Sequence, residues 1–256
     1  MLVACDYPVK RIYADSRAVT AVAFNEQLSV ITPVSRPQLL PAIGSSVPRG
    51  AEWILVSDGA MAIPDGLRPH ILICGPRTTN WGHAQRALGL EAATRRFVYF
   101  LDDDNVMLPS LGELLIPYLE RYTLAGVLFG ILIHVSAGNT HVWPAPPKVR
   151  LGRVDTAMFL GRREESLQLQ FHKPVDARGW PNVRGREGDF IFLKAYESKF
   201  GLTRLPALYG FHNGLALLRQ LQPWFFRNVE SKLRSTTALE ALLNRYLIRE
   251  DVPPWW

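Results

Sequence analysis

A chain of 256 residues is long enough to bury a sizeable core, as one large domain or two small ones. Its 48% hydrophobic and 20% charged residues are typical of a folded globular protein and exclude an intrinsically disordered chain. Most of the net charge of +6 lies in residues 151–256, where 16 Lys and Arg against 11 Asp and Glu favour an anionic partner or a solvated basic surface.

Hydropathy and cysteine usage bear on the compartment. The longest apolar run, residues 125–135, is shorter than the roughly 20 residues that a membrane-spanning helix needs. Residues 1–16 lack the charged-then-apolar order of a signal peptide. Cys5 and Cys74 make neither a disulfide framework nor a metal cluster. We therefore expect a cytoplasmic protein with reduced thiols.

The first 135 residues predict short apolar strands that alternate with helices. Strands are expected at residues 28–32, 53–60, 70–75, 97–101 and 127–135, and helices at residues 39–47, 78–96 and 108–122. Pro33 and Pro37 are expected to end the first strand. This alternation is typical of an α/β protein whose parallel sheet is covered on both faces.

The second half of the chain is less regular. Residues 154–161 indicate a strand, and residues 189–201 a helix with Gly201 as its C-terminal cap. Residues 171–188 form a long basic segment, which is typical of a lid, a binding loop or a disordered stretch. The aromatic and basic tail, residues 216–256, is expected to form helices. These would pack on the domain or on a second subunit in a homodimer, or would dock on a membrane surface.

Three consecutive carboxylates, Asp102, Asp103 and Asp104, directly follow the apolar strand at residues 97–101. In an extended segment Asp102 and Asp104 point to the same side, with Cα atoms ~6.5 Å apart. Their charges would repel by roughly 2.5 kcal/mol at an effective dielectric constant of about 20. A divalent cation bound between the two carboxylates would turn this repulsion into a net attraction. Asp58 ends another strand, and in parallel sheets ligands bind beyond the carboxyl ends of the strands.

Three interpretations of the triple acid compete. A calcium loop of the EF-hand type fails because Val106 and Met107 occupy the fifth and sixth positions from Asp102. The sequence around Asp102 matches, over a short stretch, the motif of the haloacid-dehalogenase-like phosphotransferases, in which Asp102 would be the nucleophile. That family, however, carries the motif on its first strand and expects an Asp where Leu193 and Lys194 stand. The third interpretation is a nucleoside diphosphate bound through Mg²⁺ or Mn²⁺.

The order of the segments resembles the GT-A-fold nucleotide-sugar glycosyltransferases, particularly those of family 2, across roughly residues 28–215. The segments that carry the resemblance are SVITPVSRPQLLPAI, EWILVSDGA, NWGHAQRALGLEAA, FLDDDN, REGDFIF and LYGFHNG. The resemblance implies a GT-A (Rossmann-like), mostly parallel central sheet flanked by helices, with a C-terminal helical extension. It divides the chain into a catalytic domain, residues 1–215, and the extension, residues 216–256. Within the domain, residues 28–135 would bind the nucleotide sugar and residues 136–215 the acceptor.

The resemblance also implies a function. A metal-dependent enzyme would move a sugar, typically a hexose, from a nucleotide-diphosphate donor to an acceptor hydroxyl, with inversion, in polysaccharide or glycolipid assembly. The expected cofactor is a divalent cation, Mn²⁺ or Mg²⁺. The expected partners are the donor and a glycan or lipid-linked glycan acceptor, with no nucleic acid. The tail would give a peripheral contact at the inner face of the membrane, or a homodimer.

Site residues follow from the same resemblance. It implies catalysis by Asp189 or Glu187, metal ligation by Asp102, Asp104 and His212, and nucleotide contacts from Pro33, Ser35, Asp58, Arg86 and Asp103. Ser57 departs from the usual D-D-G-S, and Gly188 departs from the usual Glu-Asp pair, so the base can be either acid. No role is predicted for His83, His134, His141 or His172. The phosphotransferase and a non-catalytic nucleotide-sugar or glycan-binding protein are kept as alternative hypotheses.

Overall fold

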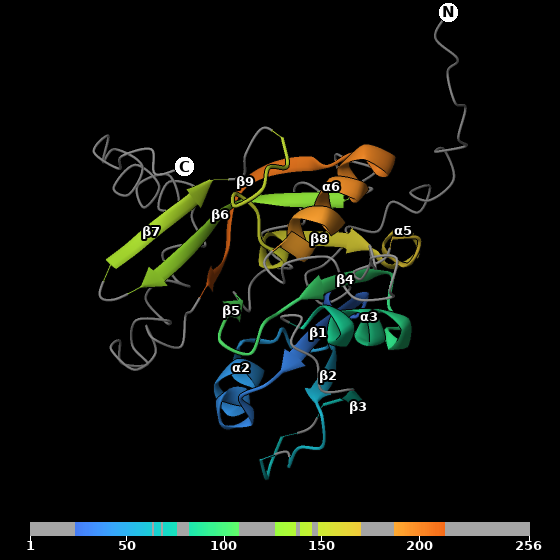
Figure 1. The fold of residues 1–256 in the computed structure, drawn as a ribbon. Coiled ribbons are helices and arrows are strands. Elements are labelled where there is room, and N and C mark those ends of the chain that lie inside the picture. Colours follow the sequence, from blue (N-terminus) through green and yellow to red (C-terminus); the bar gives the residue numbers. More distant parts are fainter. Residues whose placement is uncertain are drawn as a thin grey trace, which may run out of the picture.

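The described strands of the computed structural model form one sheet with helices packed against it (Figure 1). The structure describes residues 24–62, 64–67, 69–75, 82–107, 126–136, 139–144, 148–169 and 187–212. The strands are β1 (Leu28–Val34), β2 (Glu52–Asp58), β3 (Ile71–Gly75), β4 (Phe97–Phe100), β5 (Val106–Met107), β6 (Gly126–Ser136), β7 (Asn139–Pro144), β8 (Phe159–Arg162) and β9 (Thr203–His212). The helices are η2 (Pro37–Leu39), α2 (Leu40–Ser46), α3 (His83–Ala92), η3 (Thr156–Met158), α5 (Arg163–Leu167) and α6 (Gly188–Phe200).

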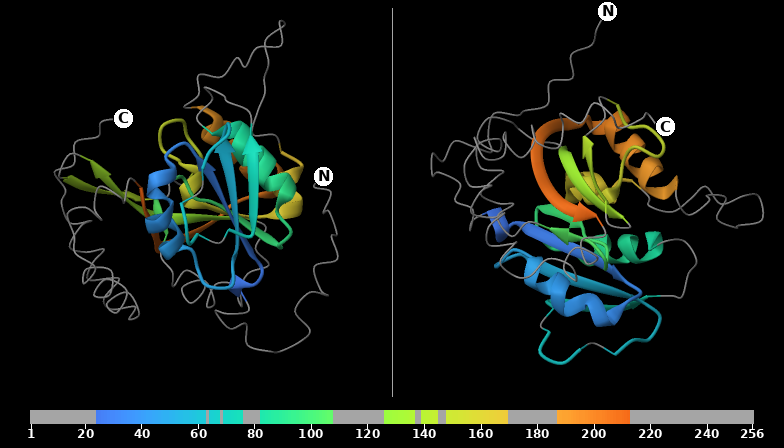
Figure 2. Two further views of the ribbon diagram at one scale, coloured as in Figure 1. Left: turned by 90° about the horizontal axis from the view of Figure 1, so that it is seen from below. Right: turned by 90° about the vertical axis from the view of Figure 1, so that its left-hand side faces the viewer.

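The first half of the sheet is parallel, as the sequence predicts. The sheet order is β3-β2-β1-β4-β8-β6-β9-β5, with β7 paired to β6. Strands β3, β2, β1 and β4 all run in the same direction. Every residue of β1 and β4 is buried, which explains their almost continuous apolar sequence. Helices α2 and α3 lie on opposite faces of this part of the sheet (Figure 2). The predicted α/β class with helices on both faces is therefore confirmed.

Strand β1 runs two residues further than predicted, through Pro33 to Val34. Alternate residues of a parallel strand bond to the same neighbour, and Ile31 accepts a hydrogen bond from Leu101 N–H on the β4 side at 2.9 Å. Pro33 faces that same side, where pairing with β4 has ended at Ile31 and Phe100. Among the described strands no partner needs the N–H that Pro33 lacks, so the proline is tolerated.

The second half of the sheet is mixed rather than parallel. β8 is antiparallel to both β4 and β6, whereas β6 and β9 are parallel. The strand predicted at residues 154–161 is shorter than expected, because Thr156, Ala157 and Met158 form the helical turn η3. Asp155 caps that turn by accepting a hydrogen bond from Ala157 N–H at 2.7 Å. The strand itself begins at Phe159.

Helix α6 is anchored to the sheet by aromatic rings. Phe192 and Tyr196 are completely buried. Phe192 makes edge-on contacts with Phe100 and Phe159, at ring-centroid distances of 5.9 and 5.5 Å. Phe159 also contacts Tyr196 at 4.7 Å. This cluster holds α6 against β4 and β8, and so fixes the start of the helix near the carboxyl end of β4.

Several predicted segments lie outside the described residues: 78–81, the helix at residues 108–122, most of the basic segment 171–188 and the tail, residues 216–256. Within the described ranges, no helix combines the length and apolar character that crossing a membrane requires.

Candidate functional site

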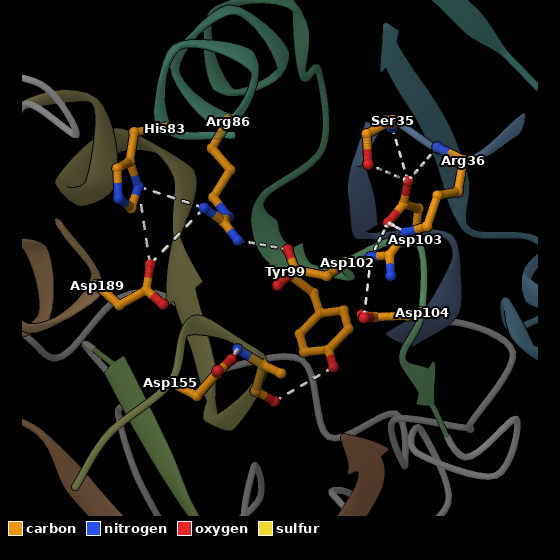
Figure 3. A network of polar contacts seen from close by, with 11 residues as sticks. Ser35, Arg36, His83, Arg86, Tyr99, Asp102, Asp103, Asp104, Asp155 and Asp189 are labelled. Carbon is orange, nitrogen blue, oxygen red and sulfur yellow. Dashed lines mark hydrogen bonds and ion pairs between the residues drawn. The ribbon is translucent and has the colours of Figure 1, made fainter. Parts of the chain in front are cut away.

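Polar side chains gather where the parallel strands end (Figure 3). Ser35 directly follows β1, Asp58 is the last residue of β2, and Asp102 follows β4 by one intervening residue. Because parallel strands bring their carboxyl ends to one edge, these residues lie at the same edge of the sheet. The first turns of α3 and α6 reach the same edge, and they bring Arg86 and Asp189 to it.

Asp103 ties the exit of β4 to the exit of β1. Its side chain is buried, and its Oδ2 accepts hydrogen bonds from the backbone N–H groups of Ser35 and Arg36, both at 2.6 Å, and from Ser35 Oγ at 3.0 Å. Its Oδ1 accepts from Arg36 Nε at 3.0 Å and from Nη2 at 2.5 Å. Both oxygens are therefore engaged by the turn after β1. The nucleotide contacts expected of Asp103 and Ser35 stay predictions.

Asp102 and Asp104 flank Asp103 and are more accessible, with side chains 23% exposed in each case. One oxygen of each is paired: Asp102 Oδ1 with Arg86, and Asp104 Oδ2 with Arg36 Nη2 at 2.9 Å. The second oxygen of each has no hydrogen bond to a described residue. Burial raises the pKa of Asp104, Arg36 opposes this, Asp102 adds to it, and the net shift is upward.

Arg86 joins the two sides of the site. The guanidinium is 3% exposed, pairs with Asp102 through Nη2, and lies 3.7 Å from Asp189 Oδ1 through Nη1. Burial alone would lower the pKa of Arg86, but the charges of Asp102, Asp189 and Asp155 raise it overall. Arg86 therefore stays cationic at any physiological pH. Its expected contact with the nucleotide stays a prediction, since these described neighbours are carboxylates.

Asp189 and Glu187 differ in their surroundings. Asp189 is the second residue of α6, its side chain is 20% exposed, and its Oδ1 is buried without a hydrogen bond to a described residue. Glu187 stands just before the helix, and its side chain makes no capping hydrogen bond. The carboxylate of Asp189 faces Arg86 and His83 (Figure 3).

Asp58 and Pro33 lie under the first turn of α3. Asp58 Oδ1 accepts a hydrogen bond from Gln85 Nε2 at 3.0 Å. Gly82 has a φ of 83°, and a Cβ at this position would fall 3.0 Å from Pro33 Cβ, so α3 begins in direct contact with the end of β1. Asp58 and Pro33 thus lie at the sheet edge where a nucleotide contact was expected. That contact stays a prediction for both residues.

The carboxylates fit a hard divalent cation in chemistry and in charge. Four acids surround two guanidiniums, which leaves a formal charge of −2; they are Asp102, Asp103, Asp104 and Asp189 around Arg36 and Arg86. Oxygen ligands of this kind suit Mg²⁺ or Mn²⁺. No group of three or more His, Cys, Asp or Glu in the described part of the chain is arranged to hold a metal ion by itself. Ligands from a diphosphate would complete such a site.

His212 enters this region through its backbone. β5, which follows the triple acid, pairs with β9 so that Val106 lies opposite Phe211. His212 is the next residue of β9 and its last. The pairing therefore brings its backbone beside the segment that ends in Asp104 and Asn105, while its side chain lies outside what the structure describes. Metal ligation by His212 stays a prediction.

Three residues near the site were missed from the sequence. Arg36 binds Asp103 and Asp104, and His83 is buried with Nδ1 3.3 Å from Arg86 Nη1. Asp155 caps η3 below them. For His83 a signal existed, because it stands three residues before Arg86 and so shares a face of the predicted helix. No local pattern singles out Arg36 or Asp155.

Comparison with known proteins identifies the family of the chain and supports its fold. Residues 52–179, half of the chain, match the sequence model of glycosyl transferase family 2. A search of the curated proteins found no significant match. Among solved structures, Staphylococcus aureus TarS 1–349 is 13% identical, with a TM-score of 0.52, over 86% of this chain and 72% of that chain. Its complex with UDP is 14% identical, with a TM-score of 0.53, over 86% of this chain and 70% of that one.

A third TarS 1–349 structure, in complex with UDP-GlcNAc, is 14% identical with a TM-score of 0.49. It covers 72% of this chain, which spans 58% of the length of that structure. At such identities the likeness concerns the fold. The predicted GT-A sheet, mostly parallel and flanked by helices, is confirmed by the two structures with TM-scores of 0.52 and 0.53 and by the family match.

Proposed function

Because the chain belongs to glycosyl transferase family 2, we propose that it transfers a sugar from a nucleoside diphosphate donor to an acceptor hydroxyl, with a divalent cation and with inversion. The observation that carries the proposal is the position of Arg86. One buried guanidinium pairs with Asp102 on the donor side and lies 3.7 Å from Asp189 on the acceptor side. On this proposal, the metal-binding acid and the general base are neighbours of the same guanidinium.

On the donor side, the second oxygens of Asp102 and Asp104 are the groups that would hold Mn²⁺ or Mg²⁺. Such an ion, when bound, neutralises charge that develops on the leaving diphosphate. Asp103 acts differently, because its hydrogen bonds to the turn at Ser35 and Arg36 fix the positions of the two neighbouring acids. Asp58 and Pro33 would line the nucleoside end of the same edge.

On the acceptor side, Asp189 is the proposed general base. An acceptor hydroxyl attacks the anomeric carbon from the face opposite the diphosphate, and the carboxylate takes the hydroxyl proton as the new bond forms. A single displacement of this kind inverts the configuration. Burial of Oδ1 beside Arg86 leaves Oδ2 as the oxygen that meets the acceptor. Glu187 is the second candidate for the same role.

We propose UDP as the first nucleotide to test, since a structure of the same fold was solved with UDP. The acceptor proposed is a glycan or a lipid-linked glycan in polysaccharide or glycolipid assembly. The transfer of a hexose, the two-part division of residues 1–215, the membrane contact of the tail and a homodimer all stay predictions.

Release of nucleoside diphosphate from a panel of nucleotide sugars tests the proposal, with water or an added glycan as acceptor. We expect release by the wild type with Mn²⁺, loss in EDTA, and loss in Asp104→Asn and Asp189→Asn. Asp189→Asn should still bind the donor. The exposed Asp65→Asn is the matched control and should behave as wild type. Donor binding without release by the wild type would favour a binding protein, and a phosphate trapped covalently on Asp102 would favour a phosphotransferase.

A further inference from the structure

The first turns of α3 and α6 meet at the imidazole ring of His83. His83 opens α3, Gly188 opens α6, and the His83 side chain is 6% exposed. A Cβ placed on Gly188 would fall 2.6 Å from Cδ2 of the ring and closer still to Nε2 and Cε1. Real side chains do not approach so closely in a packed interior. Residue 188 therefore has to be glycine for as long as the ring occupies this place.

The other edge of the same ring faces charged groups. Nδ1 of His83 lies 3.3 Å from Arg86 Nη1 and 3.8 Å from Asp189 Oδ1 (Figure 3). A guanidinium can only donate, so Nδ1 is assigned as the acceptor, which places the ring proton on Nε2. One side chain thus contacts the start of α6 on one edge and the Arg86 centre on the other.

We propose that His83 is a positioning residue for Asp189. The ring sets the distance between the first turns of α3 and α6, and Asp189 is the residue directly after Gly188. At 3.8 Å the ring confines Asp189 Oδ1 without forming a hydrogen bond to it. The carboxylate is thereby held in place while its lone pairs stay available for a proton. This inference rests on the proposed role of Asp189 as base.

Because the His83 ring positions Asp189, its effect is expected on the catalytic step. A displacement of about 1 Å in a catalytic group can lower a rate about 100-fold without any loss of the group itself. Asp103 is held by the turn after β1 and Asp102 by Nη2 of Arg86, whereas the ring lies against Nη1 of Arg86. Loss of the ring should therefore lower kcat and leave donor binding almost unchanged.

Three substitutions of His83 separate its shape from its polar contact. His83→Ala removes both and should lower kcat about 10- to 100-fold, with the donor KM within about threefold of wild type. His83→Asn restores an acceptor at the position of Nδ1, and His83→Phe restores the ring without the acceptor. Each should recover part of the lost kcat. Wild-type kcat in His83→Ala, or an equal loss of kcat and donor affinity, would overturn the proposal.

Gly188→Ala supplies an independent test through a double-mutant cycle. In the wild-type background the added methyl group collides with the ring, so we expect Gly188→Ala either to lower kcat or to prevent folding. In the His83→Ala background the methyl group has room, and the double variant should be folded and no slower than His83→Ala alone. A double variant that is slower still, or that fails to fold where Gly188→Ala also fails, would show that the ring is not what residue 188 meets.

Two outcomes with Asp189→Asn separate this inference from the proposed function. If Asp189→Asn keeps wild-type kcat, Asp189 is not the base and the role of His83 falls with it. If Asp189→Asn is inactive while His83→Ala matches wild type, the base stands and the positioning role is wrong. His70→Ala is the matched histidine control, because His70 lies before β3 and accepts a hydrogen bond from Trp53 N–H, away from the site. It should keep wild-type kcat.

Discussion

Arg86 on α3 and Asp102 after β4 form an ion pair in which the guanidinium is 3% exposed and the carboxylate 23% exposed. The same guanidinium lies 3.7 Å from Asp189 at the start of α6. A buried charge is tolerated only when it is paired. The contacts of this arginine therefore fix the relative positions of α3, the segment after β4 and the start of α6. Donor-side and acceptor-side acids are consequently coupled through a single side chain.

Arg86→Met should destabilise the fold strongly, because Asp102 and Asp189 would face each other without their cation. Removal of one partner from a buried pair lowers the free energy of unfolding by about 3–5 kcal/mol. Arg86→Lys keeps the charge without the planar guanidinium, so its free energy of unfolding should lie between those of Arg86→Met and wild type. Urea unfolding at pH 7 measures both. The exposed Arg49→Met is the control and should stay within about 0.5 kcal/mol of wild type. An Arg86→Met protein as stable as that control would contradict the account.

Asp103→Asn and Asp104→Asn should separate stability from activity. Asp103 accepts five hydrogen bonds from Ser35 and Arg36, and an amide cannot accept them all. We expect a loss of about 2–3 kcal/mol in the free energy of unfolding, measured in EDTA. Asp104 has one ion pair on a partly exposed side chain, so Asp104→Asn should change stability by less than about 1 kcal/mol. It should nevertheless abolish metal-dependent release of nucleoside diphosphate. The reverse order of stabilities would be incompatible with these roles.

Stability should fall in acid partly through Glu52. This buried side chain accepts hydrogen bonds from Ser29 Oγ at 2.5 Å, Thr94 N–H at 2.9 Å and Thr94 Oγ1 at 2.6 Å. Burial alone would raise the pKa of Glu52, but these bonds and Arg95 lower it below its ordinary value of 4.5. The stabilisation is then complete above pH 4.5 and is lost as the pH falls through the lower folded-state pKa.

The measurement is the Tm of wild type and Glu52→Gln between pH 3 and pH 7. Wild type should be the more stable protein at pH 7, and the two Tm values should converge as the pH falls below about 4.5. The exposed Glu91→Gln serves as control and should follow wild type throughout. A constant difference across the range would mean that ionisation of Glu52 does not matter.

Phe192→Ala should reveal how α6 holds Asp189. Phe192 is completely buried against Phe100 and Phe159, and its truncation should lower the free energy of unfolding by about 3–5 kcal/mol. Because the helix then loses its anchor on β4, kcat should fall together with stability. Leu151 is 54% exposed, and Leu151→Ala should change neither. Stability loss with wild-type kcat would show that the start of α6 is fixed by other contacts.

Local patterns in the sequence predicted the parallel half of the fold well. The apolar run of β4 followed at once by Asp102, Asp103 and Asp104 indicates a strand end with a polar site, because both features are local. β9 was missed because Pro206 and Gly210 argue against a strand. Its pairing with β6 is irregular between Leu205 and Leu208, which is where the proline is accommodated.

Contacts within the site were harder to predict than its place. Arg36 and Asp103 are 67 residues apart in the chain, and only the parallel pairing of β1 with β4 brings their strand ends together. The role of His83 depends on Gly188, a residue on another helix that the sequence shows only as a departure from the usual acidic pair. Such contacts arise from tertiary packing, on which periodicity carries no information.

The most direct test of the central claim is thermal unfolding with a panel of nucleoside diphosphates, each with Mn²⁺ and with EDTA. Saturation at 100 times Kd stabilises a protein by about 2.7 kcal/mol, which raises Tm by several degrees. We predict such a shift for one nucleotide, UDP first, only with Mn²⁺, absent in Asp104→Asn and retained in Asp189→Asn. No shift with any nucleotide, or the same shift in EDTA, would contradict a metal-dependent nucleotide-sugar site built on Asp102 and Asp104.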